Sequence, residues 1–195
     1  MATITIEPAT ASRFDDVEHT FDGGGDGRSC QCQWWMITNA EWSKTSQQGR
    51  RELLADEIAA TLPPGLVAYV DGEAAGWVRV GPRPRHVRIG RTLIIKGSTG
   101  EPLDDDSVWT VSCFVVRKEH RGQGLNARLL DAAVDFARAN GARVIEAYPI
   151  DPDAGKKRSS NELFHGVIST FENAGFQEVA RPKPDRPIVT LALDA

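Results

Sequence analysis

The sequence predicts a mixed α/β domain built around one sheet. Three observations lead to this class. Residues 108–116 form an almost continuous apolar, β-branched run, which is typical of a strand at the centre of a sheet. Residues 127–139 carry apolar side chains at helical spacing, and strand and helix patterns alternate along the chain. The length of 195 residues suits one domain, which we expect to span residues 1–195.

Composition narrows the class of protein. Hydrophobic residues make up 41% of the chain and charged residues 26%, as in ordinary soluble domains. A net charge of -4 argues against a nucleic-acid partner, and no apolar run reaches the roughly 18 residues of a membrane span. The N-terminus lacks a secretory signal, and an odd count of 3 cysteines favours a reducing compartment. We therefore expect a cytoplasmic protein without a membrane partner.

The first third of the chain predicts short elements. Residues 3–7 alternate apolar and polar side chains, as a strand does, and Ser12 can cap a helix that follows it. Clustered glycines predict a flexible loop at 23–27. A helix is expected over 50–61, because prolines follow directly and cannot continue it.

A hairpin and a long loop are expected next. Residues 66–70 and 75–80 read as its two strands, because Asp71-Gly72 favours the positive φ angles of a type I′ turn. The segment 83–107 is long and rich in turn residues, as functional loops often are.

The second half of the chain alternates strands and helices more regularly. Turn residues bound each predicted element: a helix over 127–139 stopped by Asn140-Gly141, a strand over 143–150, a helix over 162–174 with Gly175 at its C-terminus, and strands over 176–180 and 188–193.

The turn between the central strand and the first of these helices contains two glycines. In Arg121-Gly122-Gln123-Gly124-Leu125, glycine lets the backbone approach a ligand without an intervening Cβ. The first turn of a helix has unpaired N–H groups that favour an anion, and Arg121 adds a positive charge. The turn therefore predicts a pyrophosphate-binding site. The alternative is a tight turn that binds nothing.

Two other phosphate motifs fail in this sequence. Ala127 stands where the dinucleotide fingerprint has its third glycine, and Gly155-Lys156 is followed by Lys157 where a P-loop needs serine or threonine. We expect the basic residues 156–158 to form a solvated loop.

Two stretches resemble the GNAT superfamily of N-acetyltransferases. Cys113-Phe114-Val115-Val116, four linking residues and Arg121-Gly122-Gln123-Gly124-Leu125-Asn126 are similar to its acetyl-CoA signature, Q/R-x-x-G-x-G/A after a central strand. Residues 171–176 are similar to the family's C-terminal helix, which ends in an aromatic-x-x-x-Gly-Phe pattern. The order of strands and helices fits along nearly the whole chain.

The resemblance implies a mostly antiparallel sheet flanked by helices, in which the strands at 108–116 and 143–150 splay apart. It implies that acetyl-CoA is the acyl donor and that an amine attacks the thioester directly. By the same resemblance the pantetheine arm lies against Phe114, Val115 and Val116, and the pyrophosphate lies on the amides of Gly122, Gln123, Gly124, Leu125 and Asn126, beside Arg121.

Two residues depart from the family pattern. Asn126 stands where glycine or alanine is usual, although its backbone amide remains available. Phe171 falls where the family has a tyrosine acid, and phenylalanine cannot donate a proton. Another group must therefore protonate the thiolate that leaves.

The chemistry also needs a base, because an amine is protonated at pH 7. Glu146 and Tyr148 share one face of the strand at 143–150, since side chains alternate along a strand. We expect Glu146 to be the base and Tyr148 the acid, with His165 and Cys113 as weaker alternatives. The competing interpretation is that Glu146 makes a buried hydrogen bond and Tyr148 only packs.

An unusual run of cysteine and tryptophan has two interpretations. Cys30, Cys32, Trp34 and Trp35 either belong to an aromatic core or form one wall of the acceptor pocket, with the loop 83–107 as another wall. Too few ligands lie near the cysteines in sequence for zinc, so we expect no metal site.

The function expected is acetyl transfer from acetyl-CoA to a primary amine. The acceptor is left open between a small molecule and a protein lysine or N-terminus, and the oligomeric state between a monomer and a homodimer. One alternative is a non-catalytic acyl-CoA sensor on the same fold. Another is an interaction protein that binds no cofactor.

Overall fold

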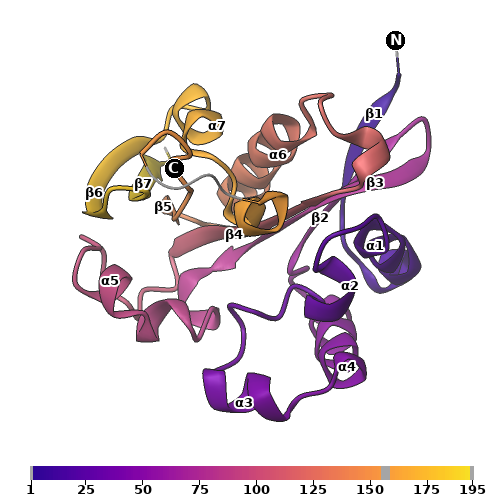
Figure 1. The fold of residues 1–195 in the computed structure, drawn as a ribbon, viewed down its shortest axis with the longest axis horizontal. Coiled ribbons are helices and arrows are strands. Elements are labelled where there is room, and N and C mark those ends of the chain that lie inside the picture. Colours follow the sequence, from indigo (N-terminus) through magenta and orange to yellow (C-terminus); the bar gives the residue numbers. More distant parts are fainter. Residues whose placement is uncertain (1, 155–158, 194–195) are drawn as a thin grey trace.

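The seven strands found among the described residues form one sheet. The computed structural model describes residues 2–154 and 159–193 (Figure 1). The strand order across the sheet is β1-β2-β3-β4-β5-β7-β6. The strands are β1 (Ile4–Pro8), β2 (Gly65–Val70), β3 (Glu73–Pro82), β4 (Val108–Val116), β5 (Val144–Ala147), β6 (Gln177–Lys183) and β7 (Arg186–Ala192). Neighbouring strands are antiparallel except β4 and β5, which are parallel.

Helices cover both faces of the sheet. The α-helices are α1 (Phe14–Phe21), α2 (Gly27–Cys30), α3 (Asn39–Lys44), α4 (Gln47–Ile58), α5 (Leu93–Lys96), α6 (Leu125–Ala139) and α7 (Ile168–Asn173). The short 3-10 helices are η1 (Ala11–Arg13), η2 (Arg83–Arg85), η3 (Ile89–Arg91), η4 (Lys118–His120) and η5 (Ser160–His165). Among the described residues, no helix has the length and apolar character needed to cross a membrane.

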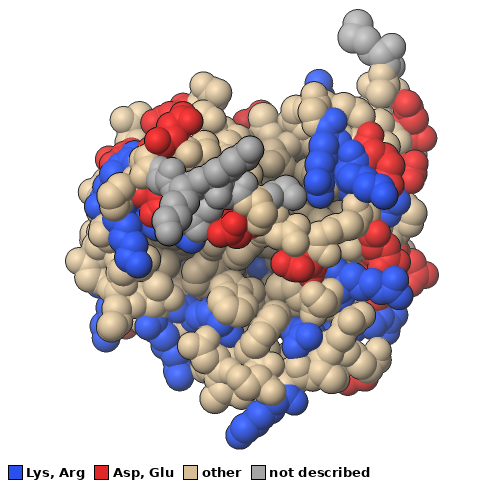
Figure 2. Space-filling model, viewed as in Figure 1, with Lys and Arg blue, Asp and Glu red and all other residues tan. Residues whose placement is uncertain are grey.

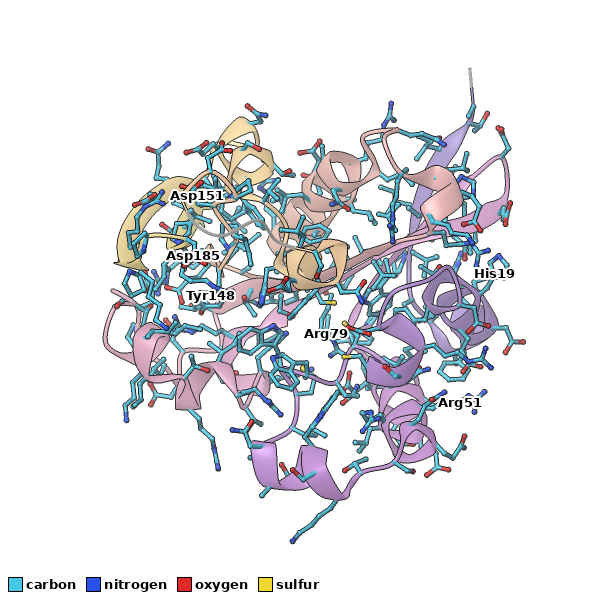
Figure 3. All side chains as sticks on the ribbon, in the orientation of Figure 1. His19, Arg51, Arg79, Tyr148, Asp151 and Asp185 are labelled. Atoms are coloured by element: carbon cyan, nitrogen blue, oxygen red, sulfur yellow. The ribbon has the colours of Figure 1, made fainter. Side chains whose placement is uncertain are left out.

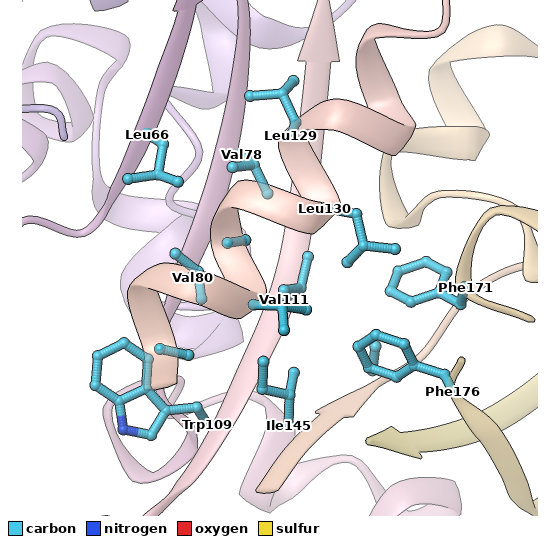
Figure 4. Close-up of a cluster of buried hydrophobic side chains, with 14 of the residues drawn as sticks. Leu66, Val78, Val80, Trp109, Val111, Leu129, Leu130, Ile145, Phe171 and Phe176 are labelled. Atoms are coloured by element: carbon cyan, nitrogen blue, oxygen red, sulfur yellow. The ribbon is translucent and has the colours of Figure 1, made fainter. Parts of the chain in front are cut away.

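The larger core lies between α6 and the sheet. Leu129 and Leu130 of α6 are fully buried against Val78 and Val111, and two aromatic side chains, Phe171 and Phe176, extend this core toward α7 (Figure 4). A second core fills the opposite face, where Val17 and Phe21 of α1 meet Trp77. Side chains of β3 therefore alternate between the two cores, with Val78 toward α6 and Trp77 toward α1.

The two central strands diverge after a short parallel ladder. β5 pairs with β4 only from Val108 to Val111, and the chain beyond β5 turns away so that Ile150 bridges Val167 instead. The last residues of β4 therefore have no strand partner on the β5 side. The β3–β4 register also shifts, because Ser112 is an extra residue between Val111 and Cys113. The implied splay of the central strands is confirmed.

Several expectations from the sequence are confirmed. The central strand spans the predicted residues 108–116 and is the fourth of seven strands. The hairpin turn has φ angles of 49° at Asp71 and 87° at Gly72, as a type I′ turn requires. The positive φ of Gly141 and of Gly175 agrees with the predicted helix ends.

Other boundaries are wrong, each for a local reason. Ser12 lies in η1 and caps nothing, because α1 begins two residues later with Arg13 as its N-cap. The helix expected over 50–61 is α4 and begins earlier, because the Ser46 hydroxyl accepts a hydrogen bond from Gly49 N–H.

The later expectations need correction as well. The expected helix at 162–174 is η5 and α7, separated at Gly166, whose φ is 79°. The expected strand at 143–150 ends at Ala147, where its partner β4 diverges. The expected loop 83–107 contains η2, η3 and α5, and helix α3 was not predicted. The expected basic loop at 156–158 lies outside the described residues.

Candidate functional site

The turn before α6 has the backbone geometry of an anion site. Gly122 and Gly124 have φ angles of 76° and 74°, and a Cβ on either would meet no atom within 4 Å. Gly124 is the N-cap, and neither a side-chain cap nor an acidic residue occupies the first turn of α6. The first N–H groups of this 15-residue helix therefore face open space, where they favour an anion.

Positive charge and a polar side chain flank this turn. Arg121 donates from Nε to the Val116 carbonyl at 3.2 Å, and no described carboxylate pairs with it. Asn126, which departs from the usual glycine or alanine, has a buried Oδ1 without a described partner. Arg117 is held elsewhere, by the His19 carbonyl and Glu119. The amides and Arg121 thus fit the diphosphate that the family signature implies.

A cavity of about 480 Å³ extends from this turn along the free end of β4. Its walls combine the signature residues with the aromatic run and η5. The lining includes Cys30, Cys32, Trp34, Trp35, Trp42, Cys113, Phe114, Val115, Val116, Arg121, Asn126, Asn161, Leu163 and Phe164. Gly25 and Asn161 both line it and lie against each other, because a Cβ on Gly25 would lie 3.1 Å from Asn161 Oδ1. In Figure 2, uncharged side chains dominate the middle of this face, and Lys and Arg side chains lie around its lower edge.

The structure thus brings together most of the predicted site residues. Phe114, Val115, Val116, Arg121 and Asn126 line the same cavity as Cys30, Cys32, Trp34 and Trp35. Leu125 is buried at the start of α6, and Gly122, Gln123 and Gly124 form the exposed turn beside it. The aromatic run is therefore both core and pocket wall. Trp35 is buried, whereas Trp34 stays 37% exposed.

Three thiols gather around a buried arginine on this wall. Gln31 and Cys32 have φ angles of 50° and 53°, a strained turn that points the Cys32 thiol inward. Trp77 donates its Nε1 proton to Cys32 Sγ at 3.2 Å, and Arg79 pairs with Glu57 at 2.6 Å. Figure 3 shows Arg79 near the centre of the molecule, beside sulfur atoms.

The thiols differ in acidity because their neighbours differ. Burial raises the pKa of Cys30 to about 11. Burial also opposes ionisation of Cys32, but the Cys113 thiol and the charge of Arg79 together lower its pKa. The same contact with Cys32, together with burial, raises the pKa of Cys113 well above its usual range. The thiolate with the lowest pKa is thus held beside Arg79, in the inner wall of the cavity.

Glu146 and Tyr148 do meet, but in a buried ion pair. Glu146 Oε1 lies 2.8 Å from Arg83 Nη1, and both side chains are at most 1% exposed. Thr99 donates to Glu146 Oε2 at 2.5 Å, and the Tyr148 hydroxyl donates to Oε1. Burial, then the charge of Glu146, raises the pKa of Tyr148 well above its usual range. Neither residue lines the cavity along β4.

A second cavity of about 690 Å³ adjoins the first. Trp34 and Trp35 line both cavities, so they form a shared wall. The second cavity is also lined by α3, by the segment after β3 and by the β6–β7 hairpin. His165 lines it at the end of η5, with its ring 5.4 Å from Trp35 and 3.9 Å from Phe164. His165 therefore lies where the two cavities meet.

Sequence reasoning missed the arginines that structure this region. Arg79, Arg83 and Arg88 are all buried, yet in sequence they look like ordinary surface residues. The one signal was that Arg83 and Arg88 lie in the long segment 83–107 and Arg79 shortly before it. Phe171, expected where the family has its tyrosine acid, is fully buried and packs on Phe114 and Phe176.

The comparisons with known proteins agree with this geometry. The model of the acetyltransferase (GNAT) family matches residues 33–157, which include β4 and α6. The chain therefore belongs to the GNAT family and is an acyltransferase whose acyl donor is acetyl-CoA. No curated protein matches the sequence.

Solved structures share the fold at low sequence identity. The protein yncA of Salmonella typhimurium, solved with its cofactor acetyl-CoA, has a TM-score of 0.58 at 18% identity, over 98% of this chain and 94% of that one. An N-acetyltransferase from Staphylococcus aureus Mu50 has a TM-score of 0.57 at 16% identity, over 98% and 99%. An acetyltransferase from Thermus thermophilus has a TM-score of 0.54 at 14% identity, over 98% and 97%.

Proposed function

We propose that this acetyltransferase moves the acetyl group of acetyl-CoA to a primary amine of a small molecule by direct attack. The observation that carries the proposal is the cavity along β4. It joins an unoccluded helix N-terminus at one end to the tryptophan wall at the other. A donor that carries a diphosphate at one end and a thioester at the other fits a cavity with these two kinds of wall.

Different groups of the chain would bind different parts of acetyl-CoA. The amides at the start of α6 and Arg121 would hold the diphosphate, as anions bind at helix N-termini. Phe114 to Val116 have no described strand partner on the β5 side, so backbone polar groups on that side would pair with the pantetheine amides, although the Val116 carbonyl already accepts from Arg121 Nε. Bound acetyl-CoA supplies an activated carbonyl. The complex of yncA with acetyl-CoA supports this use of the fold.

A small acceptor suits the second cavity better than a protein chain does. Four separate parts of the chain wall this cavity, and its tryptophan wall is shared with the donor cavity. The four parts are residues 34–40, 88–94, His165 and 183–186. An amine seated there would approach the thioester from the side opposite the diphosphate site. A protein lysine or N-terminus remains the alternative acceptor.

The proton that the amine loses needs a base near this shared wall. Glu146 was the expected base, with Tyr148 as the acid, but the Glu146 carboxylate is taken up by Arg83, Thr99 and Tyr148. His165 lines the second cavity beside Trp35. We therefore place His165 as the base and keep Glu146 and Tyr148 as the alternative pair.

One observation favours a second candidate, a non-catalytic acyl-CoA sensor. Phe171 is fully buried where the family has its acid, so α7 offers no proton donor at that position. A sensor would bind acetyl-CoA without turning it over. For either function we propose a reducing compartment such as the cytoplasm, because the three cysteines are free thiols. Whether the protein is a monomer or a homodimer stays a prediction.

Thiol release from acetyl-CoA against a broad panel of amines tests the proposal. We expect micromolar acetyl-CoA binding by calorimetry and turnover with at least one small amine. Arg121→Gln should weaken binding several-fold, because it removes a positive charge from the diphosphate site. The matched control is Arg138→Gln at the far end of α6, which should not change it. Tight binding without turnover on any amine would establish the sensor, and absence of binding would refute both candidates.

A further inference from the structure

The second cavity has an unusual concentration of positive charge. Arg88, Arg91, Lys183 and Arg186 all line it. None of the described lining residues is acidic; Glu41 is close enough to Arg91 to feel its charge but stays outside. A cavity with several cations and no described acid raises the local concentration of anions.

Arg88 is the cation of this cavity whose terminal nitrogens have no described hydrogen-bond partner. Its side chain is only 7% exposed, and its Nη1 and Nη2 are buried without a described hydrogen-bond partner. Nε donates to the Ile37 carbonyl at 3.1 Å, and Arg88 N–H donates to the Trp35 carbonyl at 3.0 Å. These two bonds fix the guanidinium against the segment 35–37 and leave both terminal nitrogens unused.

The aromatic neighbours of Arg88 do not replace a hydrogen-bond acceptor. Its guanidinium carbon lies 3.8 Å from the Trp34 ring centroid and 5.8 Å from that of Trp42. Stacking stabilises the charge through the ring faces but satisfies none of the four terminal N–H donors. Burial lowers the pKa of Arg88, yet a guanidinium keeps its charge in proteins. A buried charge without a hydrogen-bonded counterion is costly.

An oxyanion fits this position chemically. Two parallel N–H groups of a guanidinium bind a carboxylate or a phosphonate through two oxygens, with a geometry that selects such groups. Trp34 covers the face of the guanidinium and is itself 37% exposed, whereas an oxyanion binds in the guanidinium plane at the edge that carries the N–H groups. Arg91, which is exposed, and Lys183 supply further charge at the rim.

We infer that the second cavity binds the oxyanion of the acceptor, with Arg88 as its anchor. The acceptor is then a small amine that also carries a carboxylate or a phosphonate. The inference rests on the proposed function, because it assigns the amine end of the same molecule to the wall formed by Trp34 and Trp35. The buried Nε1 of Trp35, which has no described partner, is a further donor on that wall.

Matched acceptors test the inference with the full-length protein. The anionic probes are L-phenylalanine and 3-aminopropylphosphonate, and their neutral counterparts are L-phenylalaninamide and 3-amino-1-propanol. We expect kcat/KM for at least one anionic probe to exceed that of its neutral counterpart by tenfold or more. The two anionic arms distinguish a carboxylate site from a phosphonate site.

Two substitutions and one control locate the effect. Arg88→Gln should raise KM for the preferred anionic probe at least tenfold, with little change in kcat or in acetyl-CoA affinity. If Arg88→Gln does not fold, Arg91→Glu at the exposed rim should lower the same preference. Arg85→Gln, three residues away, exposed and outside the cavity, is the control and should behave as the wild type.

The possible failures are distinguishable. Absence of acetyl-CoA binding refutes the proposed function itself. Turnover of neutral or cationic amines in preference to the anionic probes refutes the inference and leaves the proposed function intact. An anionic preference that survives in both Arg88→Gln and Arg91→Glu also overturns the inference.

Discussion

At the scale of single residues, the ion pair between Arg83 and Glu146 links the long segment after β3 to the centre of the sheet. Arg83 also donates to the Thr99 hydroxyl and to the carbonyls of Glu101 and Pro102. The pair is buried, so each partner depends on the other for charge compensation. These contacts make Glu146 a residue that holds 83–107 in place.

The substitution Glu146→Gln tests this assignment. It keeps the shape but leaves the charge of Arg83 uncompensated, so we expect a loss of about 3 kcal/mol in the free energy of unfolding. Because Glu146 does not line the donor cavity, kcat of the folded fraction should fall less than tenfold. Urea denaturation and steady-state kinetics measure the two effects. Unchanged stability together with a collapse of kcat would restore Glu146 as the base.

His165→Asn should have the opposite effects to Glu146→Gln, with a large loss of activity and a small loss of stability. Removing a general base typically costs a factor of about 10² or more, so we expect kcat/KM to fall at least that far with little loss of stability. The acidic limb of the pH–rate profile should also flatten, because the titrating base is gone. A profile that keeps its acidic limb in His165→Asn would refute the assignment.

At the scale of elements, the β4–α6 turn is the segment in which we expect backbone conformation and binding of the donor to depend on each other. Gly124 combines a positive φ with open space above it and with the first free N–H groups of α6. A side chain there would be strained and would also project into the space assigned to the diphosphate. The positive φ angles of Gly122 and Gly124 account for two glycines so close together.

Gly124→Ala should therefore impair binding as well as folding. We expect about 1–2 kcal/mol of destabilisation from the left-handed conformation, and a rise of roughly tenfold in KM for acetyl-CoA. Gly141→Ala is a matched control, because Gly141 has φ of 83° at the other end of α6. It should cost similar stability and leave KM unchanged. Equal KM values in both variants would show that the turn does not bind the donor.

At the scale of the whole molecule, buried ionisable groups make stability depend on pH. His86 is buried behind β3, and its Nδ1 donates to the Pro82 carbonyl at 3.2 Å, while Nε2 has no described partner. Burial first, and the charge of Arg79 second, lower the pKa of His86 from 6.5 to about 3. The folded protein therefore keeps this imidazole neutral over a wide range of pH.

Acid should weaken the fold through His86 well before it protonates the carboxylates. The unfolded chain takes up this proton near pH 6.5 and the folded protein does not, so stability is complete above that pH and declines as pH falls toward 3. The expected loss is about 1 kcal/mol between pH 6 and pH 5. In His86→Gln, urea denaturation at the two pH values should show a smaller difference. An equal difference in both proteins would contradict this account.

Local sequence patterns predicted the strands and turns correctly where the conformation depends only on neighbouring residues. The apolar run at β4, the Asp71-Gly72 turn and the glycines before α6 depend on backbone preference and burial, which short segments encode. The family resemblance rested on those same segments, and with it the prediction of the splayed sheet; the donor site that it implies stays a prediction. These features could be read from the sequence because they need few long-range contacts.

The boundaries that were wrong depend on contacts between distant segments. Residues 162–174 have a helical pattern, but Ile150 bridges Val167 across a break at Gly166. The strand at β5 is short because β4 diverges from it, which its own residues do not encode. A short stretch of sequence contains neither the bridge between Ile150 and Val167 nor the path of β4 beside β5.

The difference between what the sequence predicts and what only the folded structure decides is largest for charged side chains. Arginine and glutamate are usually exposed, so residue type placed Glu146 among candidate bases and gave Arg88 no role. Folding buries both, and pairs Glu146 with Arg83 while leaving the terminal nitrogens of Arg88 without a described partner. The sequence was sufficient for the family, the sheet and the conformation of the turn before α6, because these follow from backbone and burial patterns. The cavity that we propose for the acceptor and the partner of each buried charge required the folded chain, because electrostatic roles depend on which distant groups come within a few ångströms.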